Sequence, residues 1–464
     1  MAASADDSTT PGSPAVPEAW ARDFGNGGYS LLYDVSKSYE GRLARRMMRD
    51  GVVAALFNRQ GRAKLRTNIE QFLYNCLACR AGQRLLDARA DGERLWIAVP
   101  LWEAYQGKSR YRLTHVSYDY LKKVLTLAER EGWIKILPGD FVNEKVTRFR
   151  PVEGFAGMVD GYLTDLAGQV RFHPPVEGIV LKDCEKRLVQ YQDDETTCTL
   201  RAELEDYNGR IDSLNIGLFV NYSNTSIHQS SSILPLRIGT EIDTSTSWFL
   251  KDLEMEERWD GVLYSIPSAL ARAVRIFNRG SWKHSGRYYA PYQNLPRIIR
   301  SGLMLDGEKT AELDYSGLHL RMLYNYRGMG LEGDPYEIPG LPRKAVKRTL
   351  LVMLNAGTYQ SMYKLLNGEV EAGKLDTKGI PVREIVRELK EKHDPVKSYF
   401  NSDAGVLLQR WDSELASRIL KKITALVIHD SYIVRHSQTA ELRTIMEEAY
   451  RDVFGFSIPI DPSS

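Results

Sequence analysis

The segment TALVIHDSYIVRHS, residues 424–437, constrains the fold of this chain more than any other stretch. Two runs rich in β-branched and aromatic residues flank a short polar turn, HDS, at residues 429–431. Such a pattern predicts a β-hairpin. A carboxylate among buried strands costs free energy unless it is paired or binds a metal ion. The turn is therefore either an ordinary one, made by its Asp and Ser, or the edge of a functional site.

Two segments upstream predict a second carboxylate and a cationic helix face. KTAELDYSGLHLRMLYNY has the pattern of a strand over residues 310–313, followed by Asp314 and then a helix. PRKAVKRTLLVMLNAGTY has the pattern of a helix whose one face begins with Arg343 and Lys347, because residues four apart share a face.

Two Asp residues on separate strands, with Arg and Lys on one helix face, are suited to two-metal chemistry. Two divalent ions about 3.5–4 Å apart activate an attacking hydroxyl and stabilise the leaving group. Magnesium prefers few carboxylates, together with waters and phosphate oxygens. Arg and Lys side chains bind phosphates and neutralise developing charge. The three segments together predict a site for nucleotidyl transfer.

These segments resemble motifs A, B and C of the family A DNA polymerases and the phage-type single-subunit RNA polymerases. DYSGLHLR is similar to motif A, RKAVK keeps the Arg and Lys of motif B four residues apart, and IHDSY is similar to motif C. GRYYAPYQNLPR resembles the family segment that grips the primer–template. The resemblance covers roughly residues 280–450 and implies a right-hand polymerase palm, an antiparallel sheet with helices.

The resemblance implies a DNA-directed DNA polymerase that extends a primer with two Mg²⁺ ions, with Mn²⁺ as a possible substitute. It places the metal on Asp314, Asp430 and the carbonyl of Tyr315, and the catalytic role on Asp314, Asp430, Lys347 and Arg343. The nucleoside triphosphate would be bound by Arg343, Lys347, His319, Leu351, Asn355 and Tyr359. The primer–template would be bound by Arg287, Gln293, Asn294, Arg297 and His429.

Three departures from the family leave open whether the product is DNA or RNA. His319 stands where family A DNA polymerases have a Glu that helps exclude the ribose 2′-hydroxyl. Motif B ends in Asn-Ala-Gly rather than Tyr-Gly, and Ser431 follows the RNA polymerase version of motif C. We favour DNA synthesis from motif A and QNLPR, and an RNA polymerase or primase of the single-subunit type is the alternative. A catalytically inactive DNA-binding replication initiator is a second alternative, and a two-metal nuclease is disfavoured.

Residues 113–152 predict a helix capped by Ser117, followed by two strands around a Pro-Gly-Asp turn. With earlier helices over about 40–88 and 100–108, this order is typical of a winged helix, which places a helix in a DNA major groove. A winged helix that contacts protein is the alternative. The side chains expected to face phosphates are Lys122, Lys123, Lys145, Arg148 and Arg150.

The chain is therefore predicted to be an α+β protein with four parts. These are a disordered tail (1–38), a winged-helix-like DNA-binding domain (39–152), a mostly helical region that is thumb-like or a linker (153–250), and a polymerase palm and fingers domain (251–464). A DNA-tethering domain fused to a polymerase suggests replication of a phage or other mobile element.

Composition adds limits rather than a function. The net charge is only +2, so DNA or RNA must be bound by local basic patches. No apolar run is long enough to span a membrane, and the N-terminus lacks the features of a signal peptide. We therefore expect a cytoplasmic protein without membrane contact. Cys76 and Cys79 form a lone CxxC with helical spacing, which favours buried thiols over a zinc site.

Overall fold

The computed structural model describes residues 20–23, 28–32, 34, 37–49, 62–87, 94–99, 110–111, 118–139, 146–162, 169–173, 175–223, 225–226, 236–238, 241–243, 250 and 253–462. The chain divides into two compact units. Unit 1 comprises 1–177, 214–272 and 294–309, and unit 2 comprises 178–213, 273–293 and 310–464. Strand pairing is mostly antiparallel, which confirms the α+β class. No helix within the described ranges is both long and apolar enough to cross a membrane.

The elements of unit 1 are β1 (Trp20–Asp23), β2 (Gly28–Leu32), β3 (Lys37–Tyr39), α1 (Arg42–Arg49), α3 (Arg62–Asp87), β4 (Arg94–Val99), α4 (Tyr118–Arg130), β5 (Ile134–Leu137), β6 (Thr147–Pro151), α5 (Glu153–Asp160), β7 (Val170–Phe172), β9 (Ile216–Asn221), β10 (Thr225–Ser226), β11 (Leu236–Ile238), β12 (Glu241–Asp243), β13 (Glu254–Arg258), β14 (Gly261–Ile266), α8 (Ser268–Ala271), α9 (Arg297–Arg300) and β17 (Leu303–Leu305).

The elements of unit 2 are β8 (Ile179–Leu181), α6 (Glu195–Asp212), β15 (Val274–Phe277), β16 (Ser285–Tyr289), α10 (Leu318–Tyr326), α11 (Arg343–Asn355), α12 (Tyr359–Glu371), α13 (Val382–Lys392), η4 (Asp394–Tyr399), α14 (Gly405–Lys422), β19 (Leu426–Ile428), β20 (Ser431–Arg435), η5 (His436–Gln438), α15 (Thr439–Phe454) and β21 (Ile460–Pro462). Two elements have residues in both units: η3 (Pro291–Asn294) and β18 (Glu308–Tyr315).

The N-terminal part of unit 1 is a sheet of order β1-β2-β4-β6-β5 with α3 packed on it. Its core contains Phe72 of α3, Phe149 of β6 and Phe155 of α5, all with at most 3% of their surface exposed. Each such side chain contributes about 1.5–3 kcal/mol on burial. Cys76 and Cys79 are buried in the same helix, as predicted.

α4 confirms the helix predicted after residue 117. Its apolar stripe is buried and consists of Leu121, Val124, Leu125 and Ala128. The helix stops just before Gly132, whose φ of +70° only glycine adopts readily. The predicted hairpin follows as β5 and β6, which pair antiparallel. Ser117, Lys145 and the helix predicted over 100–108 lie outside the described residues.

The described residues differ from the predicted organisation of the chain in three places. The tail predicted over 1–38 contains β1 and β2 from Trp20 onward, since β2 gains a parallel ladder on β4 that local sequence does not reveal. The described residues of 153–250 carry α5 and α6 but also six strands, β7 to β12, where a mostly helical region was predicted. The compact units also do not follow the boundaries predicted at 152 and 250, because unit 1 includes 214–272 and 294–309.

A second sheet of unit 1 has the order β13-β14-β9-β17, and residues 308–309 of β18 continue it. β14 pairs with β9 over six residues, from Gly261 opposite Asn221 to Ile266 opposite Ile216. The alternate burial along β9 shows that one face of this sheet is covered and the other more open.

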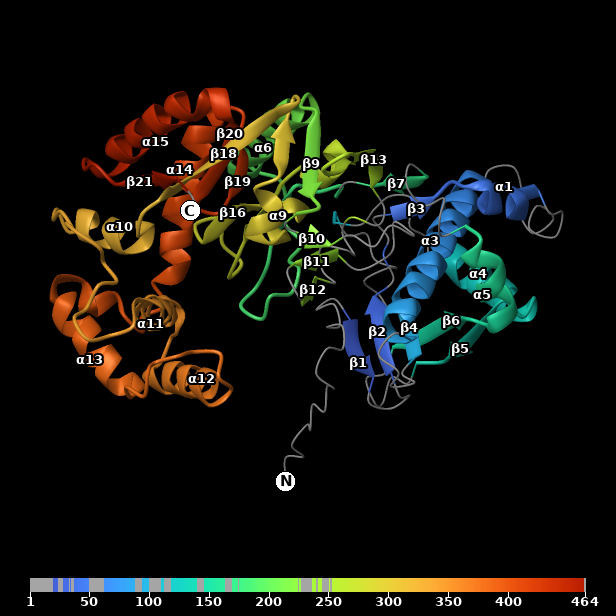
Figure 1. Cartoon of the computed structure of the whole chain (residues 1–464), viewed down its shortest axis with the longest axis horizontal. Coiled ribbons are helices and arrows are strands. Elements are labelled where there is room, and N and C mark those ends of the chain that lie inside the picture. Colours follow the sequence, from blue (N-terminus) through green and yellow to red (C-terminus); the bar gives the residue numbers. More distant parts are fainter. Residues whose placement is uncertain are drawn as a thin grey trace. The chain divides into compact units, whose positions relative to one another are not determined.

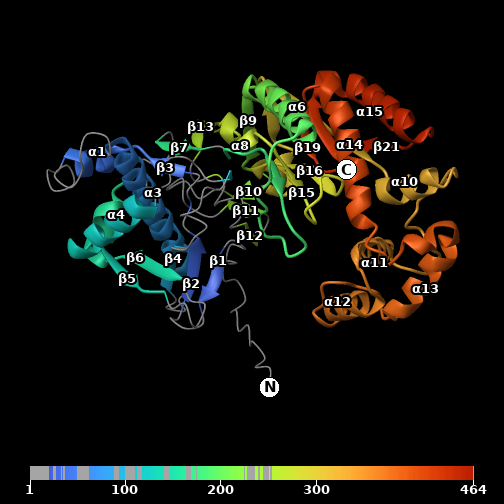
Figure 2. The same cartoon turned by 180° about the vertical axis from the view of Figure 1, so that it is seen from behind.

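Unit 2 is built around β18, β20 and β19, with β21 on the other side of β18. α14 packs on β16, and α15 packs on α14 and β20 (Figure 1). α11, α12 and α13 contact one another and form a separate helical group next to one end of α14, as both views show (Figures 1 and 2). The strand predicted over 310–313, the helix after Gly317, the helix beginning at Arg343 and the hairpin around His429 and Asp430 are all confirmed as elements.

Candidate active site

β18 brings the two predicted Asp residues together. In its ladder with β20, Asp314 lies opposite Ser431, and the amide of Tyr315 donates to the carbonyl oxygen of Asp430 at 3.4 Å. On the other side of β18, β21 places Asp461 directly opposite Asp314. Directly opposite residues extend from the same face of a sheet. A third acidic side chain, which the sequence did not predict, therefore lies beside the expected pair.

Asp314 has an unusual environment for a carboxylate. Burial, and next the charge of Asp430, raise the pKa of Asp314 to about 7, although Lys347 acts in the opposite direction. Its Oδ1 atom is buried and has no hydrogen-bond partner among the described residues. Leaving a buried polar atom unpaired costs free energy. The site therefore holds unbalanced negative charge that a cation would neutralise.

Tyr336 lies close both to the cationic start of α11 and to Asp430. The Lys347 Nζ lies 5.5 Å from the centre of the Tyr336 ring, and the Arg343 guanidinium lies 5.3 Å from the same centre. Arg343 also forms a salt bridge with Asp334. Burial, and next the charge of Asp430, raise the pKa of Tyr336 to about 12. Tyr336 is in a loop without a periodic pattern, so nothing in the local sequence marked it.

The other predicted nucleotide-binding residues on α11 and α12 are exposed. Leu351 has 43% of its surface exposed, and Asn355, one turn later, is also exposed and donates to the Leu351 carbonyl oxygen at 2.8 Å. Tyr359 begins α12, and the Lys390 Nζ lies 4.2 Å from the centre of its ring. The opposite side of α11, which includes Val346 and Leu350, is buried. The face is therefore open to a ligand.

Arg287 lies in an internal cluster. Its Nε donates to Asp412 of α14, and its Nη2 lies 3.0 Å from the Nε2 of His319. Since a guanidinium only donates, the His319 Nε2 is the acceptor. Burial, and next Arg287, lower the pKa of His319 to about 3, so the imidazole is neutral at physiological pH. Arg287 thereby links the segment that resembles the primer grip with the motif A position held by His319.

Asp412 is a second residue that the sequence did not predict. Only 1% of its surface is exposed, and its Oδ1 has no hydrogen-bond partner among the described residues. Burial raises its pKa to about 6, Arg287 opposes the shift, and Asp430 adds to it. Because Asp412 lies near Asp430, the site carries more negative charge than Asp314 and Asp430 alone would give it.

Replacing Asp412 with Asn should stabilise the protein by about 2–4 kcal/mol at pH 8, because burial raises the pKa of Asp412 to about 6 and the folded state then carries an unfavourable charge that Asn lacks. The gain should be smaller at pH 5, where Asp412 is largely protonated in the wild type. Urea unfolding at the two pH values measures the change. Asp394→Asn is the matched control, since its ion pair with Lys397 is exposed and contributes little. Equal midpoints for Asp412→Asn and wild type at pH 8 would contradict this account of the cluster.

His429 has a backbone conformation that is uncommon for a residue with a side chain. Its φ is +54°, in the two-residue turn between β19 and β20. Its ring is edge-on to Tyr289, with the ring centres 5.8 Å apart. Burial, and next Arg287, lower the pKa of His429, and Asp430 acts in the opposite direction. Such strained positions recur at functional sites, which agrees with a role for this turn beyond chain reversal.

The other residues predicted to bind the primer–template are divided between the two units. Gln293 in unit 2 donates through Nε2 to the carbonyl oxygens of Val427 at 2.8 Å and Tyr288 at 3.1 Å, so it supports the strand before the turn. Asn294 and Arg297 are exposed and belong to unit 1.

Two side chains next to the carboxylates are occupied by internal contacts. The Tyr315 hydroxyl donates to the Met446 carbonyl oxygen at 2.6 Å, and its ring is buried, so this side chain packs in the core. The Ser431 hydroxyl donates to Glu312 at 2.7 Å. Ser431 therefore pairs with a carboxylate from the same strand as Asp314.

The basic residues predicted for DNA binding lie on two surfaces of unit 1. Lys122 and Lys123 are exposed on α4, and Arg148 and Arg150 are half-buried on β6. Arg150 lies directly opposite Lys135 of β5, and its guanidinium lies 5.2 Å from the centre of the Trp96 ring. Because like charges directly opposite each other repel, this face is suited to an anionic partner.

The described residues contain no group of three or more His, Cys, Asp and Glu side chains placed to hold a metal ion. A scan against protein-family models gives no match, and a search of curated proteins gives none either. The functional argument therefore depends on the residues of the site themselves.

Proposed function

We propose that the protein is a template-directed nucleotidyltransferase, a DNA polymerase of the family A type that extends a primer. The observation that carries the proposal is the closeness of Asp314, at the end of β18, to Asp430, in the turn before β20, with Lys347 acting electrostatically on Asp314. A hairpin that only reversed the chain would not need a neighbouring buried carboxylate with an unpaired oxygen.

The residues present fit a pair of Mg²⁺ ions. The unpaired Asp314 Oδ1 and the raised pKa of Asp314 both indicate a carboxylate that lacks a countercharge. Asp314 and Asp430 would hold the ions, and the Tyr315 carbonyl is an additional oxygen at the same place. Two carboxylates without a full protein cage match the preference of Mg²⁺ for waters and phosphate oxygens. When bound, the ions would activate the primer hydroxyl and stabilise the leaving pyrophosphate.

The cationic end of α11 would bind the triphosphate. Arg343 can hold phosphate oxygens with two parallel hydrogen bonds, and Lys347 can donate a proton to the departing pyrophosphate. Tyr336 packs against both cations and limits their freedom before the substrate arrives. Leu351, Asn355 and Tyr359 would continue the binding surface toward the sugar and base.

A specific observation keeps RNA synthesis as the second candidate. A carboxylate at the position of His319 would be needed for the sugar selection of the family, and here a neutral imidazole is bonded to Arg287. Ser431 holds the position where motif C of the DNA polymerases has a Glu. Its hydroxyl donates to Glu312. Neither feature excludes a ribose hydroxyl by charge, so a single-subunit RNA polymerase or primase fits the same carboxylates.

One assay tests the proposal and separates these candidates. A labelled primer–template is incubated with Mg²⁺ and either dNTPs or rNTPs, and the products are resolved by length. We expect extension with dNTPs, and stronger extension with rNTPs would identify the RNA-making alternative. Binding without extension would indicate an inactive initiator, and shortening of the primer would indicate a nuclease. Either of the last two results would overturn the proposal.

We propose that unit 1 tethers the polymerase to DNA, in the replication of a phage or other mobile element. α4 is followed by the β5–β6 hairpin, and β4 completes a three-stranded antiparallel arrangement with them. This order of helix and ribbon agrees with a winged helix. The exposed Lys122 and Lys123 on α4 would contact phosphates, and the hairpin would add Arg148 and Arg150.

Replacing Lys122 and Lys123 together with Ala should weaken duplex DNA binding without changing sequence preference. The slope of log K against log salt concentration should fall in magnitude by about 1–2, because fewer counterions are released. Fluorescence anisotropy over a salt series measures this slope. The matched control is Arg187→Ala with Arg387→Ala, since both guanidinium groups are already engaged by neighbouring carboxylates. An unchanged slope in the Lys variant would remove α4 from the DNA interface.

A further inference from the structure

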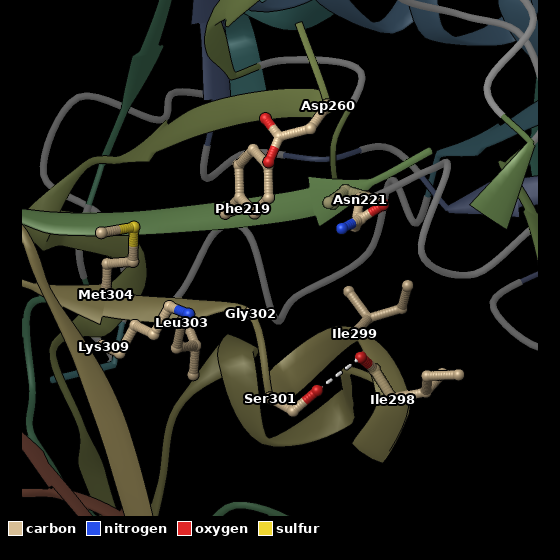
Figure 3. A pocket seen from close by; sticks show the side chains of 11 residues that line it. Phe219, Asn221, Asp260, Ile298, Ile299, Ser301, Gly302, Leu303, Met304 and Lys309 are labelled. Atoms are coloured by element: carbon tan, nitrogen blue, oxygen red, sulfur yellow. Dashed lines mark hydrogen bonds between the residues drawn. The ribbon is translucent and has the colours of Figure 1, made fainter. Parts of the chain in front are cut away.

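Unit 1 contains a cavity of about 390 Å³ between its second sheet and α9 (Figure 3). The side chains that matter most for its chemistry are Phe219, Asn221, Asp260, Ile298, Met304 and Lys309. The volume is within the range of small-molecule sites, which is roughly 300–1,000 Å³. The cavity is part of unit 1 alone and includes no residue of the proposed active site.

Two glycines, Gly302 in the cavity wall and Gly261 beside Asp260, allow close approach of the backbone around this cavity. A Cβ atom at Gly302 would lie 2.0 Å from the Phe219 carbonyl oxygen, and one at Gly261 would lie 2.4 Å from the Val220 carbonyl oxygen. The Phe219 amide donates to the Gly302 carbonyl oxygen at 2.8 Å. Backbones this close admit no other residue without movement. A larger residue at either position would therefore displace the backbone of β9, which forms one wall of the cavity.

One end of the cavity carries a carboxylate and an amide. Among the described residues, none donates a hydrogen bond to the Asp260 carboxylate, which Figure 3 shows at the edge of the cavity above Phe219. The Asn221 Oδ1 accepts from the amide and the hydroxyl of Ser223, at 2.7 and 2.6 Å. This orientation turns the Asn221 amide nitrogen toward the cavity (Figure 3). The Asp260 carboxylate is therefore the acceptor that this end of the cavity offers.

The other end carries a cation. Lys309 pairs with Met304 in the ladder, and Met304 pairs with Gly217, four residues before Asn221 along β9. Four strand residues span about 13 Å, so the backbone of Lys309 lies about this far along the sheet from that of Asn221. Phe219 lies between these ends and offers one half-buried aromatic face. The ligand should therefore be flat in the middle, rich in donors at one end and anionic at the other.

We propose that this cavity binds a guanine nucleotide. The guanine N1–H and amino group are adjacent donors for the Asp260 carboxylate, which only accepts. Adenine has an acceptor where guanine has N1–H, so the carboxylate would repel it. The base stacks on Phe219, an interaction worth about 1–3 kcal/mol, and the phosphate pairs with Lys309. The same chemistry is available from a free nucleotide or from a guanosine within a single strand.

Calorimetric titration of the full chain tests this assignment. The protein carries Asp314→Ala and Asp430→Ala, and the buffer contains EDTA, so the proposed polymerase site does not contribute. We expect GMP to bind at least 10-fold more tightly than AMP, and Asp260→Asn to remove that preference while the melting temperature is unchanged. Lys309→Met should weaken the binding of GMP about 10-fold and leave the binding of guanosine unchanged, since only the partner of the phosphate is lost.

A second arm distinguishes the two sources of the base. A thymidine oligonucleotide with one central guanosine is compared with the same strand carrying adenosine. Trp259, the turn residue beside Asp260, is 93% exposed and offers a stacking surface to a neighbouring base. If the site binds a guanosine within a single strand, Trp259→Ala should weaken the binding of the oligonucleotide but not the binding of GMP. Equal binding of guanine and adenine ligands in both arms would overturn the proposal, whatever the result of the primer-extension assay.

Discussion

Asp314→Ala and Asp430→Ala should each reduce primer extension by roughly 10³-fold or more. Each carboxylate would share in holding the metal ions, and metal-ion stabilisation of the transition state amounts to several kcal/mol. Asp314 lies on β18 and Asp430 in the turn before the adjoining strand β20, and the charge of Asp430 acts on Asp314. Loss of either carboxylate should therefore remove most of the activity of the site. The measurement is single-turnover extension of a labelled primer at saturating nucleotide.

Asp452→Ala is the matched control for this loss. Asp452 is an exposed carboxylate on α15, in the same unit, and it takes no part in the site. Its rate should stay within about twofold of wild type, because exposed substitutions away from special features have small effects. If Asp314→Ala and Asp430→Ala extended the primer as well as Asp452→Ala, the site assignment would be wrong.

Asp314→Asn should stabilise the metal-free protein at pH 8 by roughly 2–4 kcal/mol. The pKa of Asp314 is raised to about 7 in the folded state, above its value in the unfolded chain. The folded state therefore binds the proton more tightly, and its advantage is complete below about pH 4. That advantage is lost as the pH rises through 7 and the buried carboxylate becomes charged. Asn carries no charge at any pH, so the variant avoids the loss.

Urea unfolding of wild type and Asp314→Asn in EDTA, at pH 4.5 and pH 8, checks this expectation. The variant should unfold at higher urea than wild type at pH 8 and at nearly the same concentration at pH 4.5. Adding Mg²⁺ at pH 8 should stabilise wild type but not the variant, since a ligand that binds only the folded state raises stability. A lower urea midpoint for the variant at pH 8 would contradict this prediction, because it would show that the charged Asp314 carboxylate stabilises the folded state.

Both predictions follow from one physical feature of the site. Carboxylates held together under burial repel, and Asp412 adds a further charge beneath them. Proteins keep such strain where function requires it, because a site poised to bind a cation is unstable without one. The same substitution should therefore raise stability and abolish activity.

Local sequence was sufficient for the elements that carry the expected site. The alternation of apolar residues on either side of HDS specified β19 and β20, and the run before Asp314 specified β18. The residues at every fourth position from Arg343 onward specified the exposed face of α11. These patterns depend only on the period of a strand or a helix, which is a property of neighbouring residues.

The tertiary structure alone decided which residues surround those elements. β21 comes from the end of the chain to place Asp461 opposite Asp314, and Asp412 reaches the cluster from the interior of α14. Tyr336 is in an irregular loop, and the cavity beside Phe219 is formed from three separate stretches of sequence. Strand pairing and packing between distant segments depend on the whole chain, so no local period records them. The sequence by itself determined the two carboxylates and the cationic helix face, whereas long-range pairing set the charge, burial and neighbours that give them their chemistry.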